Sequence, residues 1–204
     1  MPDTTHFYEP KLGHNLSHDP FNAIIAPRPI GWISTLANKG QANLAPYSFF
    51  NAFNYQPPLI GFASVGDKDT LNNARRTGEF CWNLATVELA QAMNLTSKDT
   101  GQDEFELAGL TKRTSKIINP PQVAESPVVM ECKTSQIIQL QSAKGELCDS
   151  WLVIGEVVGV HIDKSLIENG VYQTVKGQPI LRGGGAGDYY SINETNKFEM
   201  LRPK

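Results

Sequence analysis

The chain has 204 residues, a formal net charge of −3 and a hydrophobic content of 40%. A chain of this size can bury a core without disulfides or metals, so we expect one domain over residues 1–204. The acidic balance argues against a protein that binds nucleic acid through a basic surface. The three cysteines are odd in number and lack a CxxC spacing, which favours reduced thiols over a disulfide framework.

Two segments of the sequence indicate where in the cell the protein is located: the N-terminus and the longest apolar run. The opening MPDTTHFYEPKLGHN is polar and unlike a secretory signal, and we expect residues 1–20 to form a tail. The run WLVIGEVVGV, which starts at Trp151, contains Glu156 and is too short to cross a bilayer. We therefore expect a cytoplasmic protein without a membrane partner.

Strand patterns dominate the chain. Turn residues at Asn38–Gly40 and at Lys144–Gly145 predict two antiparallel hairpins. Several strands are apolar on nearly every residue, which predicts that both of their faces are covered by helices or by a second copy of the chain. The predicted strands, in chain order, are 29–37, 41–50, 58–65, 79–86, 127–140 and 150–162.

Two short helices and two irregular segments complete the expected organisation. One helix has Asp69 as its cap and Gly78 as its stop, and the other begins with a Thr86 cap. The polar segment 97–116 is an excursion or a lid. The glycine-rich segment 183–204 is a C-terminal loop or tail, because no strand–turn–helix unit supports a dinucleotide-binding loop there.

Side chains with catalytic or metal-binding patterns are scarce. The sequence has neither an HExxH nor a GxSxG motif, so we expect no metal site and no catalytic residue of the protein itself. His161 ends an apolar strand, and a structural role is favoured for it. The sequence therefore directs attention to binding groups rather than to a proton-transfer pair.

Two groups of residues suit a planar, phosphorylated ligand. A phosphate at Thr70, beside Lys68, would meet the unpaired amides of a helix start; the alternative is that Asp69 simply caps the helix while Lys68 points into water. Ser48 and Asn51 supply polar groups for the edge of a flat heteroaromatic ring. Phe49, Phe50 or Trp32 would contact its face, and each of these could instead belong to the core.

Seven motifs occur in the order found in the flavin reductase-like, FMN-binding split-barrel family. They are PRPIGWIST, NLAPYSFFNAF, PPLIGFAS, KDTLNNARRTGEFCWNLAT, DEFELAGLT, AESPVVMEC and GEVVGVHID. The resemblance covers roughly Phe21–Ile162 and extends weakly to ILRGGGAGDYY. It implies a mainly β fold with short helices, a six-stranded antiparallel split β-barrel of Greek-key type, and a homodimer with FMN near the subunit interface.

The resemblance also implies residue roles. Ser34 and Thr35, with the Lys68–Thr70 group, match the part of the family motif that holds the ribityl phosphate, and Ser48–Asn51 match the part that lines the isoalloxazine edge. Asp149–Trp151 stand where many short flavin reductases carry a histidine, which favours the flavoredoxin-like branch. The implied cofactor-binding residues are Trp32, Ser34, Thr35, Ser48, Phe49, Phe50, Asn51, Lys68, Asp69 and Thr70.

The implied activity is that of an FMN-binding oxidoreductase. FMN would carry the redox chemistry, with NADH or NADPH as the electron donor and a small molecule or a redox partner protein as the acceptor. An FMN-binding electron carrier that does not oxidise nicotinamides shares every motif and stays open. A barrel that binds single-stranded nucleic acid by stacking would need a basic groove, which the charge balance disfavours.

Overall fold

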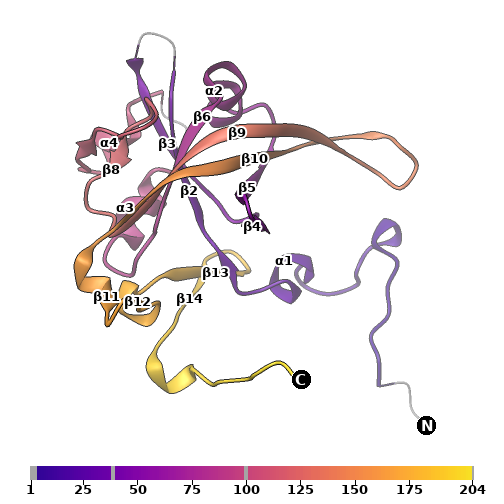
Figure 1. Ribbon diagram of the computed structural model, residues 1–204. Coiled ribbons are helices and arrows are strands. Elements are labelled where there is room, and N and C mark those ends of the chain that lie inside the picture. Colours follow the sequence, from indigo (N-terminus) through magenta and orange to yellow (C-terminus); the bar gives the residue numbers. More distant parts are fainter. Residues whose placement is uncertain (1–3, 38–39, 99–100, 204) are drawn as a thin grey trace.

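The computed structural model describes residues 4–37, 40–98 and 101–203, and its main feature is one antiparallel sheet of seven strands (Figure 1). The strand order is β3-β2-β6-β9-β10-β5-β4. Chain neighbours form the β2–β3, β4–β5 and β9–β10 hairpins, while β6 lies between β2 and β9. The strands are β2 (Gly31–Leu36), β3 (Ala42–Tyr47), β4 (Phe50–Tyr55), β5 (Pro58–Val65), β6 (Glu79–Asn83), β9 (Val128–Gln141) and β10 (Leu147–Ile162).

The predicted antiparallel, mainly β architecture is confirmed, with seven strands in the sheet instead of six. The difference arises at Ser48 and Phe49, where a bend ends β3 and a separate strand, β4, pairs with β5. The hairpin at Gly145 is also confirmed, since Gln141 and Leu147 pair across it. The β2–β3 hairpin forms as predicted, but Asn38 and Lys39 of its turn lie outside the described residues.

The first helix, α2 (Asp69–Thr77), ends as predicted at Gly78, which adopts a left-handed conformation with φ of 68°. The capping predictions were wrong. Lys68 holds the N-cap position of α2 without a side-chain bond, and Asp69 is the first helical residue. The second helix, α3 (Ala90–Leu95), has Leu89 at its N-cap. The predicted cap, Thr86, lies three residues earlier in an isolated β-bridge with Pro179, and its Oγ1 accepts from the amide of Leu89 at 3.3 Å.

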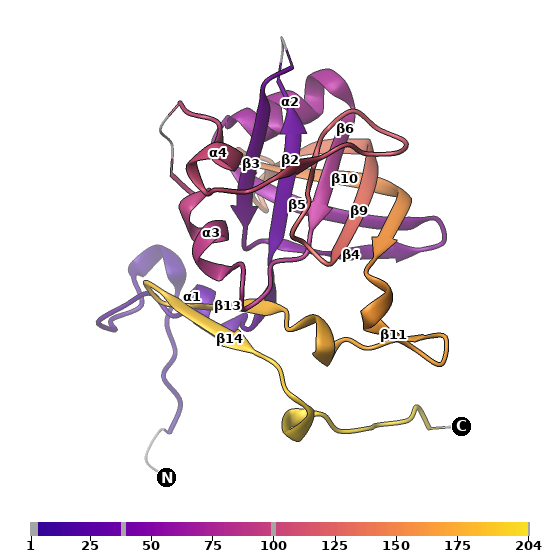
Figure 2. The same ribbon diagram turned by 90° about the vertical axis from the view of Figure 1, so that its left-hand side faces the viewer.

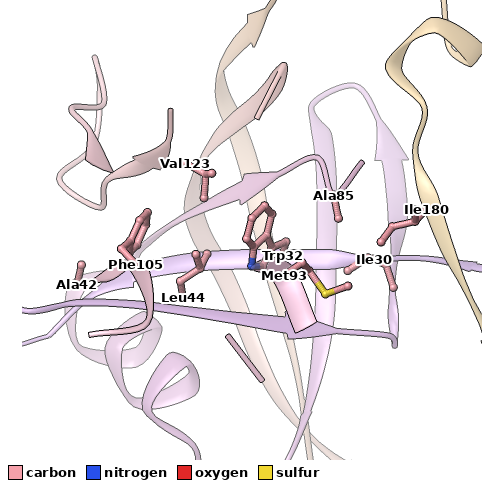
Figure 3. Packing of buried hydrophobic residues seen from close by; sticks show 9 residues of the cluster. All are labelled: Ile30, Trp32, Ala42, Leu44, Ala85, Met93, Phe105, Val123 and Ile180. Atoms are coloured by element: carbon pink, nitrogen blue, oxygen red, sulfur yellow. The ribbon is translucent and has the colours of Figure 1, made fainter. Parts of the chain in front are cut away.

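The central strand β2 is buried on both faces of the sheet, as its successive buried residues show, since adjacent residues of a strand point to opposite sides. Trp32 packs in a cluster with Leu44, Met93 and Phe105 (Figure 3). Met93 belongs to α3 and Phe105 to the short helix α4 (Glu104–Leu107), so these helices cover this side. Its neighbour Ile33 belongs to a second cluster on the side of α2. Residues of the second cluster include Phe62, Leu71, Phe80 and Val153. The prediction of strands covered on both faces is therefore confirmed for β2.

The polar segment 97–116 is anchored to the body by Phe105, which lies in the short helix α4 (Glu104–Leu107) and is fully buried in the first cluster. Residues 99–100 of this segment lie outside the described residues. Its predicted action as a lid stays a prediction.

The C-terminal segment is more ordered than the predicted loop or tail. Residues 180–191 form a hairpin of β13 (Ile180–Gly184) and β14 (Asp188–Ser191), which joins β1 (Arg28–Pro29) in a three-stranded sheet below the main sheet (Figure 2). Arg182 stabilises the turn by donating to the carbonyls of Gly184 and Asp188 at 2.9 and 2.8 Å. The β13–β14 turn is therefore stabilised by the side chain of Arg182, which the run of glycines in the sequence does not indicate.

Short elements connect and flank these sheets. Within the described ranges, no helix has both the length and the apolar character needed to span a membrane. The remaining elements are η1 (Pro10–Leu12), α1 (Phe21–Ile24), β7 (Lys112–Arg113), β8 (Gln122–Val123), η3 (Lys164–Leu166), β11 (Ile167–Glu168), β12 (Val171–Tyr172), η4 (Val175–Gly177) and η5 (Glu194–Asn196).

Candidate functional site

Two adjoining cavities run along the end of β3 and together form what we call the groove. The larger cavity, of about 670 Å³, lies between the end of β3, α3 and the β13–β14 hairpin. The smaller, of about 340 Å³, extends to the start of α2. Both are lined by Pro46, Tyr47 and Ser97. Figure 2 shows α2, α3 and the hairpin following one another along this side of the molecule. Volumes of this size are typical of small-molecule sites.

A buried hydrogen-bond network sets the α2 end of the groove. Asn43 Nδ2 donates to Thr70 Oγ1 at 2.8 Å and lies 3.4 Å from Thr35 Oγ1. Asn73 Nδ2 donates to the same Thr35 oxygen at 3.0 Å. The four side chains are buried and join β2, β3 and the first turns of α2. The network therefore holds the helix start in a defined position against the sheet.

Charges of both signs surround this end. Lys68 and Lys98 line the smaller cavity, and the start of α2 adds unpaired backbone amides and a positive dipole end. Asp67 and Asp69 also line the cavity, but the charge of Asp67 is paired with Arg75 at 2.8 Å. The cations and the helix start can therefore bind an anion here.

Glu104 is an acidic group at this end that opposes a bound anion. Its Oε2 accepts from the amide of Leu44 at 3.1 Å, at the margin of the smaller cavity. Burial, followed by the charges of Asp103 and Asp69, raises the pKa of the Glu104 carboxyl. A raised pKa means that this site protonates more readily than an exposed glutamate, which reduces its repulsion of a bound anion as the pH falls.

Tyr47 lies where the two cavities meet. Its side chain is 7% exposed and its ring packs on Phe62, with 4.7 Å between the centroids. Burial raises the pKa of the Tyr47 phenol. The hydroxyls of Thr70 and Ser64 lie near enough to the Tyr47 hydroxyl to lower this pKa in part, although no described residue meets the full geometry of a hydrogen bond with it. A buried hydroxyl without a well-formed hydrogen bond is uncommon, and this one can accept or donate a further bond beside the groove.

The residues predicted from the sequence fall in three places. Ser48, Lys68, Asp69 and Thr70 line the groove. Phe49, Phe50 and Asn51 line a separate, more apolar cavity of about 520 Å³ beside Arg28 and Leu152. Trp32, Ser34 and Thr35 are fully buried.

Those three buried residues have partners within the protein. Trp32 Nε1 donates to Thr96 Oγ1 at 3.0 Å, and Ser34 Oγ donates to the carbonyl of Pro121 at 2.6 Å. Thr35 accepts from Asn43 and Asn73 in the network at the α2 end. None of the three side chains therefore lines the groove.

Sequence reasoning missed several residues that line the groove. Asn43, Lys98, Glu104 and Arg182 lie on separate parts of the chain and meet only in the folded protein. The sequence did contain a sign that Arg182 lies at a binding site. It precedes a run of glycines, and glycine allows the backbone to approach a ligand closely. In the described part of the chain, no three His, Cys, Asp or Glu side chains gather as a metal site.

The comparisons with known proteins agree with this architecture. Residues 25–179 match the flavin reductase like domain, so the chain belongs to the flavin reductase-like family, whose solved members include a split barrel domain. This membership places the chain among flavin-related oxidoreductases.

Solved structures extend the comparison. Nitrilotriacetate monooxygenase component B from Bacillus cereus is 32% identical, with a TM-score of 0.80 over 91% of this chain and 98% of that one. The 2-nitrobenzoate 2-nitroreductase of Pseudomonas fluorescens is 28% identical, with a TM-score of 0.83 over 98% and 96% of the two chains. A split barrel domain protein of Shewanella frigidimarina, 23% identical with a TM-score of 0.76 over 89% and 90%, shares the fold.

Proposed function

We propose that the groove binds FMN and that the protein is an FMN-dependent oxidoreductase that takes electrons from NADH or NADPH. The observation that carries this proposal is the continuity of the groove. One end has two lysines and a helix start, which suit a phosphate, and the other end widens between β3, α3 and the β13–β14 hairpin, which suits a planar ring. Membership of a flavin-linked family supports the choice of ligand.

The residues present fit the phosphate of this cofactor. Lys68 and Lys98 would supply charge, and the first amides of α2 would supply donors. Thr70 is held by Asn43, so its backbone amide keeps a fixed position. Thr35 would act as a positioning residue within this network and not as a direct ligand. Ser34 bonds to Pro121 on the opposite face of β2 and takes no part in the network.

The residues at the junction fit the ribityl chain and the ring. The Tyr47 hydroxyl lacks a full hydrogen bond within the described structure, and a ligand hydroxyl beside it would supply one. Ser48 lines the wider cavity at the end of β3. Trp32 packs beneath α3 and would keep that wall rigid.

FMN, when bound, supplies the hydride and single-electron chemistry. The protein's part is then to bind, orient and shield. Lys68 and the helix start would anchor one end, Ser48 and the β3 backbone would orient the ring edge, and α3 with the hairpin would limit the access of water. No side chain of the groove needs to act as an acid or base in this scheme.

We also propose that the protein is a homodimer. The edge strand β4 exposes aromatic side chains, with Phe53 52% and Tyr55 96% exposed. The β9–β10 hairpin extends beyond the body of the molecule (Figure 1) and carries the exposed Leu147. Monomers seldom leave an apolar sheet edge uncovered. A second copy on this face would also cover the cavity that Phe49, Phe50 and Asn51 line.

The cytoplasm is the proposed location. Cys81, Cys132 and Cys148 are all free thiols. Burial raises the pKa of Cys81 to about 12, so this thiol stays protonated and unreactive at neutral pH. Unpaired cysteines of this kind are typical of a reducing compartment.

The test uses the visible spectrum. The purified chain is titrated with FMN, and NADH or NADPH is then added without oxygen. Tight binding followed by bleaching of the flavin band is expected. Binding without bleaching by either nicotinamide favours the electron carrier, which receives its electrons from another protein. A chain that binds no FMN contradicts the proposal.

A further inference from the structure

Two arginines face each other directly across a β-ladder at the hairpin end of the groove. Arg28 of β1 pairs in register with Arg182 of β13. Like charges placed opposite each other in an antiparallel pair repel and destabilise the ladder. Over the described ranges, neither guanidinium forms an ion pair with a carboxylate. The arrangement therefore concentrates two positive charges without a counter-charge.

Backbone carbonyls hold the Arg28 guanidinium in place. Its Nε donates to the carbonyl of Ser48 at 3.2 Å, and its Nη1 contacts the carbonyls of Asn22 and Ile25. The side chain lies 5.7 Å from the ring centroid of Phe49 and is 9% exposed. Burial, and then the charge of Arg182, lower the pKa of Arg28. Carbonyl dipoles fix the orientation of the group but leave its positive charge uncompensated.

Arg182 is held in a similar way, but it lines the larger cavity. Its Nη1 and Nη2 donate to four carbonyls of the β13–β14 turn, at residues 184, 185, 186 and 188. Its Nε has no hydrogen bond to another described residue. The guanidinium lies 5.0 Å from the ring centroid of Tyr189, which lines the same cavity. A cation and an aromatic face are thus presented together to the groove.

We propose that Arg28 and Arg182 form an anion-binding pair, and that the second reactant at the flavin carries a carboxylate or phosphate group that this pair attracts. The inference rests on the proposed function, because it names the chemistry of the molecule that meets bound FMN. Arg182 contacts the anion, whereas Arg28 lies behind Ser48 and adds charge without contact. The repulsion between the buried Arg28 and the half-buried Arg182, neither of which has a counter-charge, is then offset when the reactant binds.

The direct test is calorimetric titration of the FMN-loaded full chain with sodium benzoate or sodium phosphate, at constant ionic strength set with sodium chloride. FMN occupies the α2 end, so that added phosphate does not bind there. At least one anion binds to the wild-type chain, and Arg182→Gln weakens that binding about tenfold or more. The control Arg202→Gln removes an exposed cation of the C-terminal segment and leaves the affinity unchanged. The anion that binds identifies carboxylate or phosphate as the preferred group.

A second measurement covers the case in which Arg182→Gln disrupts the hairpin. Phenylglyoxal labels arginines of the wild-type chain, and mass spectrometry follows each site. The bound anion slows labelling at Arg182 and leaves the exposed Arg202 unaffected. The inference is overturned if neither anion binds to the FMN-loaded protein, if the Arg182→Gln variant binds as tightly as the wild type, or if labelling of Arg182 is unchanged.

Failure of the proposed function gives a different result. It appears before any anion is added, as a chain that does not load with FMN. The benzoate titration of the unloaded chain, repeated with Lys68→Ala and with Arg182→Gln, then still decides the anion site, since binding at the hairpin end is weakened by Arg182→Gln and not by Lys68→Ala. A shift of the flavin potential in Arg182→Gln without any anion binding would place Arg182 against the flavin itself and contradict the inference.

Discussion

The side-chain amide of Asn43 donates to the hydroxyl of Thr70 across 2.8 Å, and this bond ties β3 to the first turn of α2. Thr70 is 1% exposed, so neither partner can turn to water if the other is lost. The position of the helix start, and with it the phosphate end of the groove, therefore depends on a hydrogen bond between residues that are far apart in the sequence.

Thr70→Val keeps the size of the side chain and removes the acceptor for Asn43. We expect the free energy of unfolding to fall by about 1–3 kcal/mol, because a buried donor is left without its partner. Urea denaturation followed by circular dichroism measures the change. Thr174→Val is the matched control, since Thr174 makes no capping bond at the N-cap of η4. Equal stabilities of Thr70→Val and the wild type would show that the bond contributes nothing.

Lys68→Ala tests the phosphate end of the groove. The side chain is exposed and lines the smaller cavity, so its removal should leave folding nearly unchanged. We expect the affinity for FMN to fall by about tenfold to about a hundredfold, the effect of one charge-assisted hydrogen bond. Flavin fluorescence titration measures it. Lys133→Ala removes an exposed lysine of β9 as the control. An unchanged affinity would place the phosphate elsewhere.

The buried carboxylate of Glu131 makes the free energy of unfolding depend on pH. The carboxylate is fully buried and accepts from the amides of Lys116, Ile117 and Ile118 at 2.8, 2.7 and 3.2 Å, and His161 Nε2 lies 2.5 Å from Oε1. Burial alone would raise the pKa of Glu131, but these bonds outweigh it and lower the pKa. A depressed folded pKa means that the carboxylate stabilises the fold above its ordinary pKa of 4.5, and that this stability is lost as the pH falls through the folded pKa.

Glu131→Gln should therefore lower the free energy of unfolding at pH 7 by about 2–3 kcal/mol, with a smaller loss at low pH, where the wild type has also lost the charge. Thermal unfolding from pH 7 down to pH 3 measures this difference. Glu156→Gln, at an exposed position of β10, serves as the control. If the difference between the Glu131→Gln variant and the wild type did not shrink with acid, the charge would not be the stabilising feature.

Phe53→Lys tests the proposed dimer. A charge on the exposed edge strand β4 opposes burial against a second copy, so we expect the dimer to weaken by about thirtyfold or more. Light scattering after size exclusion, over a range of concentrations, measures the dissociation constant. Phe198→Lys changes an exposed aromatic of the C-terminal segment and should leave the dimer intact. A wild-type chain that stays monomeric at every concentration would remove the proposal.

Local patterns predicted much of the framework. The strand 58–65 coincides with β5, and the hairpin at Gly145 and the helix stop at Gly78 form where the turn and stop residues indicated. These features depend on neighbours in the chain: alternation of side chains, and backbone conformations that glycine adopts at little cost. The family motifs added the fold and the flavin class, which the comparisons confirm.

The tertiary structure decided which polar residues face the groove. Thr35 and Thr70 both follow a plausible motif, yet Thr35 accepts from two buried amides behind the groove, while Thr70 lines it. Arg28 and Arg182 stand opposite each other only because β1 and β13 pair across the length of the chain. A sequence pattern records which groups a residue carries, whereas burial and partners depend on segments that fold against it from elsewhere.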